Sequence, residues 1–218
     1  MTTESPQPPP ATPPVAGGGP ASQWSAAGGD RPVPGTAGFV YADVPNRVIA
    51  YIIDAILLFI VSFIILLLVY GIVGQPTTPT INEDATDLGN LATVNVNWLA
   101  TLVGALVSTA ISAVYFIYTW TRMRGTPGMK VLGMQVGNQD DGATLTRDQA
   151  IRRWIFLGAP LGLISALAGV SSIGLIIGLL GFLYLIFLLV TTAQSPTKQG
   201  FHDKQANTVV VKAARTVG

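Results

Sequence analysis

Four long apolar blocks, separated by polar segments, constrain this chain more than any other feature of its sequence. They cover about residues 47–73, 98–121, 151–170 and 173–192. A helix of roughly 20 residues, rising ~1.5 Å per residue, crosses the ~30 Å hydrocarbon core of a bilayer. Only 11% of the residues are charged, against about 25% in soluble domains. The sequence therefore predicts an all-α membrane protein, a bundle of four transmembrane helices in contact with the lipid bilayer.

The segments outside these blocks are polar. Residues 1–38 hold nine of the fifteen prolines, and this composition predicts a disordered tail because little apolar surface can be buried. Residues 39–212 form the transmembrane domain, in which 74–97 is a polar loop. Residues 213–218 form the C-terminal end.

The positions of the basic residues predict the orientation of the helices. All twelve lysines and arginines lie in the N-terminal segment up to Arg47, in residues 122–153, or in the C-terminal tail. None lies in the 74–97 loop or in the two-serine turn at 171–172. Lysine and arginine close to helix ends stay on the cytoplasmic side. We therefore expect a multi-pass protein of the plasma membrane with both termini in the cytoplasm.

Small residues recur along two of the predicted helices. Gly104, Ser108 and Ser112 are spaced by four in the second block, and Gly174 and Gly178 are spaced by four in the last one. Small side chains at this spacing allow a second helix to approach closely. We interpret them as helix-packing faces. The alternative is that such residues are simply common in membrane helices.

The first block contains one acidic residue, Asp54, seven positions after Arg47. Seven positions place both side chains on one face of a helix. An aspartate in the apolar region costs about 3 kcal/mol on insertion scales unless it is paired, hydrated or protonated. Direct contact between Arg47 and Asp54 across two helical turns is unfavourable. We therefore expect the partner of Asp54 to be a water molecule, or a basic or hydroxyl group from another helix. Asp54 is then either an ion or proton site or a polar clamp that fixes helix packing.

Two polar segments contain β-like runs. Residues 122–150 predict a small hairpin at the cytoplasmic surface, and a second β-like run starts at Thr208. Glycines near Lys130 lack the spacing of a phosphate loop. His202 beside Asp203 is the one candidate acid–base pair, but no framed nucleophile accompanies it.

Composition argues against several further classes of function. A single histidine and no cysteine exclude a multi-histidine or thiolate metal site. The net charge of +1 suggests no nucleic-acid partner. We predict no catalytic residues, no metal and no cofactor.

Three parts of the sequence together resemble the RDD family of bacterial membrane proteins, which is named for one arginine and two aspartates. Arg47 and Asp54 match the pattern of the first helix, and Asp203 is the candidate second aspartate. The segment 125–136 resembles the family's G-x-T-x-G-K stretch with Met129 inserted, and Lys204 stands in place of the usual arginine. The proline-rich tail is similar to that of actinobacterial proline-rich antigen proteins.

The resemblance implies two functions, because a few family members are linked to cation/proton antiport and others are accessory membrane components. The sequence favours an accessory or structural component of a homo-oligomer or a larger membrane complex. The alternative is a cation/proton antiporter in which Asp54 titrates. A single intramembrane acid is little for a complete ion pathway.

Overall fold

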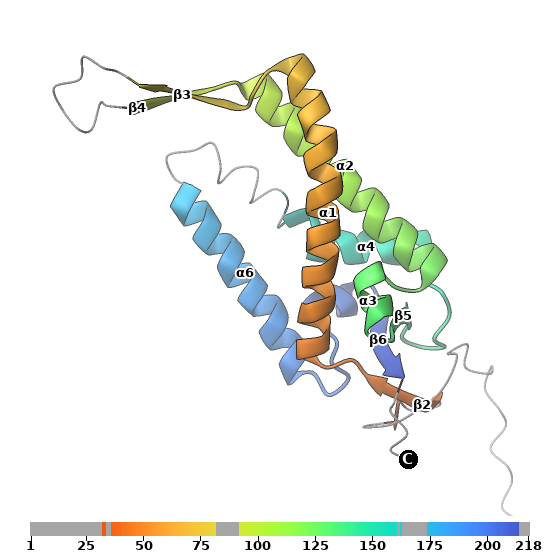
Figure 1. The fold of residues 1–218 in the computed structure, drawn as a ribbon. Coiled ribbons are helices and arrows are strands. Elements are labelled where there is room, and N and C mark those ends of the chain that lie inside the picture. The colour runs from red at the N-terminus through yellow and green to blue at the C-terminus, as the bar shows by residue number, and fades with distance from the viewer. Residues whose placement is uncertain (1–31, 34–35, 82–91, 161, 163–173, 214–218) are drawn as a thin grey trace, which may run out of the picture.

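Three long helices dominate the computed structural model (Figure 1). They are α1 (Val44–Val73), α2 (Trp98–Met123) and α6 (Gly174–Gln194). Each is long and apolar enough to cross a membrane. The structure describes residues 32–33, 36–81, 92–160, 162 and 174–213.

The ends of α1 and α2 follow from local chemistry. Helix α1 begins at Val44, three residues before the predicted start, with Pro45 in its first turn. Proline is tolerated there because the first backbone N–H groups of a helix have no partner within it. The Asn97 side chain caps α2 by accepting a hydrogen bond from the Ala100 backbone N–H at 3.1 Å.

The third predicted span is described only in part. Helix α4 (Arg147–Leu157) opens with a capping box between Thr146 and Gln149. It lies roughly across the direction of α1 (Figure 1). Residues 161 and 163–170 of the predicted span lie outside the described residues, as does the turn that follows it. The described part of the chain therefore contains three candidate spans, and the four-helix count stays a prediction.

A four-stranded antiparallel sheet lies at one end of the long helices. Its strands, in spatial order, are β1 (Pro32–Val33), β2 (Thr36–Tyr41), β6 (Thr208–Ala213) and β5 (Met134–Asn138). The prediction of a hairpin within 122–150 is wrong, because β5 pairs with the C-terminal β6 instead. A short helix, α3 (Pro127–Val131), precedes β5, and no second strand follows β5 within this segment. Strand β2 also starts two residues before the predicted end of the tail.

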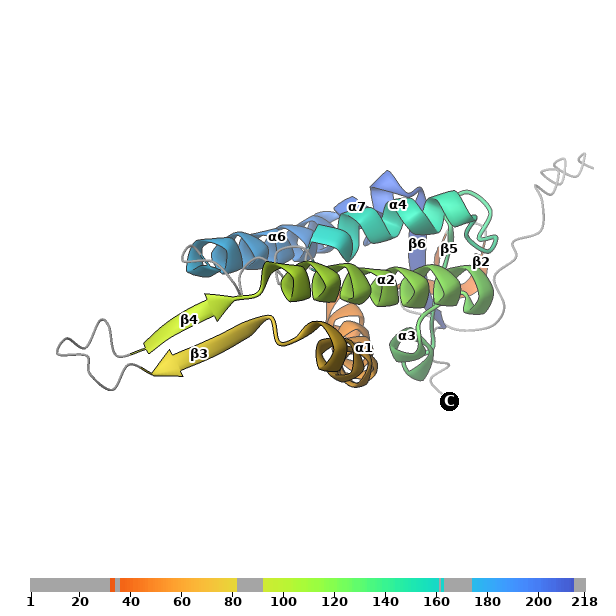
Figure 2. The ribbon, with the colours of Figure 1, turned by 90° about the horizontal axis from the view of Figure 1, so that it is seen from above.

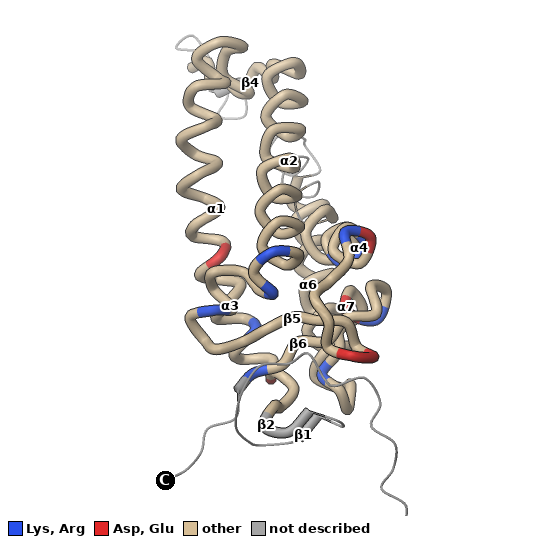
Figure 3. Tube along the Cα trace, turned by 90° about the vertical axis from the view of Figure 1, so that its right-hand side faces the viewer, with Lys and Arg blue, Asp and Glu red and all other residues tan. Residues whose placement is uncertain are grey.

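A second, two-stranded sheet lies at the opposite end of α1 and α2 (Figure 1). It consists of β3 (Thr77–Ile81) and β4 (Ala92–Val96) and occupies the segment predicted to be a polar loop. Lysine and arginine gather at the end that carries the four-stranded sheet (Figure 3). The described residues of the β3–β4 end contain no charged side chain.

The buried core also lies at the four-stranded sheet end. Helix α2 lies between α1 and α4 (Figure 2). Phe116 and Trp120 of α2 pack there with Met129, Met134 and Val210. A last short helix, α7 (Phe201–Gln205), leads into β6 and packs against α4. The sheet, the first turns of α1 and the last turns of α2 thus form one packed unit.

The β5–β6 pairing can be tested by cysteine cross-linking, because the chain has no cysteine of its own. Gln135 and Val211 lie opposite each other in the register. Opposed Cα atoms in an antiparallel pair are ~4.5–5.5 Å apart, which a disulfide can bridge. We expect Gln135→Cys with Val211→Cys to form an intramolecular disulfide on mild oxidation, measured by the mobility shift on non-reducing gels.

The matched control is Gln135→Cys with Val210→Cys, whose side chains point to opposite faces of the sheet. This pair should cross-link far less. Equal cross-linking of both pairs, or none in the first pair, would contradict the observed register.

Candidate functional site

Asp54 is buried, and its carboxylate ties three segments of the chain together. Its Oδ1 atom accepts hydrogen bonds from Tyr115 Oη at 2.6 Å and from the Gly128 backbone N–H at 2.8 Å. Its Oδ2 atom accepts a hydrogen bond from the Thr126 hydroxyl. These four residues are called the Asp54 cluster below. The cluster links α1 to α2 and to the start of α3, through hydroxyl partners and without a bond to Arg47.

The backbone around Gly128 leaves no room for a side chain. A Cβ atom at this position would lie 2.2 Å from the Ala50 carbonyl oxygen and 3.0 Å from Asp54 Cγ. Thr126 caps α3 by accepting a hydrogen bond from the Met129 N–H at 3.2 Å. Glycine therefore lets the α3 backbone approach α1 closely enough to donate to Asp54.

Asp203 is fully buried and forms a second polar cluster with two arginines. Its Oδ2 atom accepts a hydrogen bond from Arg47 Nη1 at 2.6 Å, and its Oδ1 atom is ion-paired with Arg153 Nη1. Arg153 also donates to Thr208 Oγ1 at 2.7 Å. Asp203, Arg47, Arg153 and the adjacent His202 are called the Asp203 cluster below. It connects the start of α1 with α4, α7 and β6.

Burial and neighbouring charges determine the protonation states of His202 and Asp203, the two residues of this cluster that lie on α7. Burial lowers the pKa of His202 from 6.5 to about 4, and the nearby arginine charges act in the same direction. Burial alone raises the pKa of Asp203, but the charges of Arg153 and Arg47 outweigh it, so that the pKa falls below its ordinary value. At neutral pH, therefore, Asp203 is an anion and His202 is uncharged.

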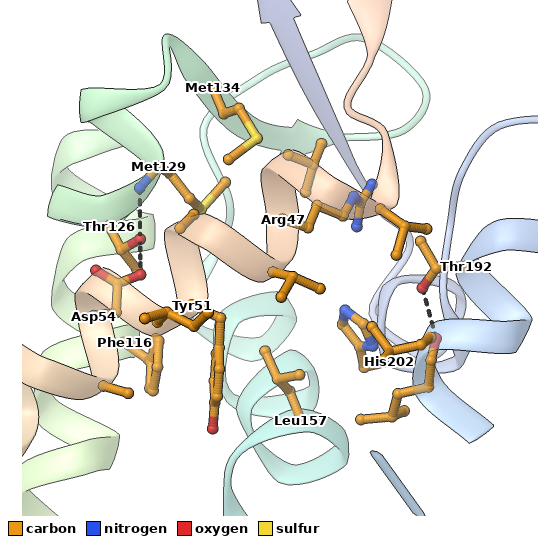
Figure 4. Close-up of a pocket in the computed structure, with 18 of the residues that line it drawn as sticks. Arg47, Tyr51, Asp54, Phe116, Thr126, Met129, Met134, Leu157, Thr192 and His202 are labelled. Carbon is orange, nitrogen blue, oxygen red and sulfur yellow. Dashed lines mark hydrogen bonds between the residues drawn. The ribbon is translucent and has the colours of Figure 1, made fainter. Parts of the chain in front are cut away.

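A cavity of about 660 Å³ lies between the two clusters and α6. Figure 4 shows Asp54 at one side and His202 at the other, with Tyr51 and Leu157 between them. Its volume is in the range of ~300–1,000 Å³ that is typical of small-molecule sites. In the part of the chain that is described, no three potential metal ligands of the His, Cys, Asp or Glu type are close enough to hold an ion.

A sequence model of the RDD family matches residues 41–207, more than half of the chain. The chain belongs to the RDD family. No curated protein and no solved structure matches it. The match contains all three candidate signature residues, so the two clusters described above lie within the family region.

The structure separates the three predicted signature residues of this RDD protein into two clusters. Arg47 contacts Asp203, which is 156 positions away in the chain, and Asp54 has partners of its own. This arrangement agrees with the prediction that a direct contact between Arg47 and Asp54 is unfavourable. The role of Asp54 as an ion or proton site stays a prediction.

The predicted helix-packing residues have different surroundings. At Gly104, a Cβ atom would overlap the Tyr70 hydroxyl of α1, and Ser112 accepts a hydrogen bond from Trp154 Nε1 of α4 at 3.1 Å. Ser108 and Gly174 are half-buried. A Cβ atom at Gly178 would meet no heavy atom within 4 Å. Among the described residues, Gly178 therefore has no packing partner, and its packing role stays a prediction.

Sequence reasoning missed several partners in these clusters. Arg153 was interpreted only as a charge flanking the third helix, although a cation inside a predicted span was itself a signal. Tyr115 was assigned to an interfacial aromatic belt. Thr126 and Gly128 were noted only as part of the family stretch. The closeness of Thr126 and Gly128 to Asp54 depends on tertiary structure, and no local pattern predicts it.

The fit of Gly128 against α1 gives a stability prediction. Gly128→Ala should lower the free energy of unfolding by about 1–3 kcal/mol, because the added methyl group forces α3 away from Ala50 and weakens the bond to Asp54. Thermal unfolding of the purified protein in mild detergent measures this change. Gly71→Ala in α1 is the control, since nothing lies within 4 Å of its Cβ position. Equal effects of the two substitutions would contradict the close approach.

The single histidine gives a pH prediction. Because the folded-state pKa of His202 is about 4 and its unfolded value about 6.5, protons bind the unfolded chain more tightly. Stability is then complete above pH 6.5 and falls as the pH decreases, by about 2 kcal/mol between pH ~7.5 and ~5. Thermal unfolding across this range measures the loss. His202→Gln should abolish most of this dependence, and an unchanged slope in that variant would contradict a buried neutral His202.

Proposed function

We propose that this RDD protein is a structural or accessory component of a membrane complex, without catalytic chemistry or a cofactor of its own. The observation that carries the proposal is the saturated carboxylate of Asp54. Both of its oxygen atoms are occupied by donors from α2 and from the residues that begin α3. Such a carboxylate acts as an anchor between segments.

The scarcity of other ionisable groups supports this proposal. The three candidate spans contain one acidic residue, Asp54, and the sequence of 163–173 contains no ionisable side chain. Proton relays and ion paths use chains of acidic or histidine side chains across the membrane. A relay past Asp54 would have to consist of hydroxyl groups or water.

The exposed surface of the spans supports assembly with other helices. In the most apolar windows of α1, α2 and α6, only 6, 17 and 11% of the residues are buried within the chain. Lipid can cover such surfaces, and so can helices of another chain, particularly at small residues. The open position of Gly178 is suited to such a contact.

For the orientation of the chain in the membrane, the proposal follows the charge pattern. We propose that the partly described span predicted at 151–170 is the remaining crossing. With four crossings, the four-stranded sheet and both termini lie in the cytoplasm. The gathering of lysine and arginine at the sheet end (Figure 3) supports the placement of this end in the cytoplasm.

Cation/proton antiport is the second candidate, and one observation favours it. Asp54 lines the cavity beside α6, so an ion could reach its carboxylate. An ion that binds this carboxylate would compete for it with the three hydrogen-bond donors.

Flux measurements separate the two proposals. We expect proteoliposomes that contain the wild type or Asp54→Asn to show the same Na⁺ and H⁺ flux as empty liposomes. In mild detergent, we expect the wild type to elute as an assembly larger than one chain, with defined subunits in stoichiometric amounts. Light scattering with mass spectrometry of the peak measures the composition.

Asp54→Asn also controls for folding in this experiment, because the variant should elute as a folded protein with reduced thermal stability. Flux in the wild type that disappears in a folded Asp54→Asn variant would replace the proposal with antiport. A monomeric wild type without any bound chain would also contradict it.

A further inference from the structure

The Asp203 cluster carries more positive than negative charge. Arg47 and Arg153 share the single carboxylate of Asp203, and neither forms an ion pair with a second acidic residue in the described part of the chain. His202 beside them is buried and contributes no negative charge. Asp54 lies ~10 Å further along α1 and is occupied by its own donors. One positive charge at the cavity wall is therefore unbalanced.

Two guanidinium atoms of this cluster are also unsatisfied. Arg47 Nη2 and Arg153 Nε are buried and have no hydrogen-bond partner within the described structure. The Arg153 side chain is only 4% exposed, so bulk water does not replace the missing acceptor. Buried donors of this kind are rare in proteins and cost free energy unless a ligand or an ordered water accepts from them. Both arginines line the cavity.

Away from the residues of the two clusters, the cavity wall is mostly apolar. Its lining on α1 extends from Val44 to Phe59, a length of ~22 Å along the helix. Leu185 and Leu189 of α6 line the opposite side. Ile56 and Phe59 are 55% and 68% exposed, so the cavity is open sideways between α1 and α6. In a membrane, this opening faces the acyl chains of the lipid.

We propose that the cavity binds one anionic phospholipid, with its phosphate at Arg47 and Arg153 and an acyl chain along α1 and α6. The fork of guanidinium N–H groups matches phosphate oxygens, and the phosphate charge balances the cluster. The acyl chain covers apolar wall that the protein leaves open. A free phosphate ion would leave this wall uncovered, and an apolar helix from a second copy would leave the charge unbalanced. The site does not depend on the membrane complex proposed above.

Substitutions that fill the apolar part of the cavity test the proposal without removing a member of either cluster. Ile56→Trp narrows the cavity, whereas Ile60→Trp, one turn further along α1, places the same side chain outside the lining. The two isoleucines are similarly exposed, at 55% and 50%. Leu185→Trp and Leu183→Trp form the corresponding pair on α6, since only Leu185 lines the cavity.

The full chain is reconstituted in vesicles of phosphatidylglycerol and phosphatidylcholine in equal amounts, extracted in mild detergent and analysed by native mass spectrometry. We expect one retained phosphatidylglycerol per chain in the wild type and in the two control variants. Retention should fall by about fivefold or more, roughly 1 kcal/mol in affinity, in Ile56→Trp and Leu185→Trp. Their thermal unfolding without added lipid should match that of their controls.

Three outcomes would overturn the site. The first is retention of phosphatidylcholine equal to that of phosphatidylglycerol, which would show that the arginines do not select the headgroup. The second is equal retention by cavity and control variants. The third is displacement of the lipid by millimolar inorganic phosphate, which would identify the arginines as a site for the free ion.

Discussion

The paired burial of Asp203 with two arginines is the interaction on which the rest of the structure depends. A carboxylate taken out of water is strongly disfavoured unless its charge and lone pairs are matched. Here Arg47 comes from the first turn of α1 and Arg153 from α4, while the Gly200 N–H adds a hydrogen bond at 3.1 Å. Loss of the Asp203 carboxylate would leave both arginines without their acidic partner in the low dielectric of the interior. The cluster therefore fixes the mutual position of elements that are far apart in the chain, and β6 enters the sheet from the same segment.

The two signature acids have related structural roles at different depths. Asp203 holds α4 and α7 against the start of α1, and Asp54 holds α3 and α2 against its third turn. The α1 side chains that make these polar contacts, Arg47 and Asp54, lie in the part of the helix near the sheet end. The remainder of the helix presents apolar side chains. This division explains how a chain with so few charged residues positions its helices by specific polar contacts. It also favours an anchoring role for the family signature over a transport role.

Hydropathy and charge predicted the parts of the fold that are local in sequence. The three described spans begin and end within three residues of their predicted limits. The four-stranded sheet was not predicted, because β5 and β6 are separated by some 70 residues and neither strand indicates its partner. Asp54 and Asp203 were recognised as unusual, the first by the cost of its burial and the second by resemblance. Their partners could not be derived, since Arg153 and Tyr115 approach them only when the chain has folded.

The distance in sequence between Arg47 and Asp203 has a consequence for biosynthesis. Arg47 leaves the ribosome 156 residues before its acidic partner, a delay of roughly 8–30 s at ~5–20 residues per second. During this interval α1 can enter the bilayer, but its arginine lacks its carboxylate, and β2 lacks the strand β6 that pairs with it. The packed unit at the four-stranded sheet end can close only after α6, α7 and β6 have been synthesised. In a chain that terminates early, Arg47 would stay without its carboxylate and β2 without its partner strand. These unpaired groups would distinguish the incomplete chain from the finished protein.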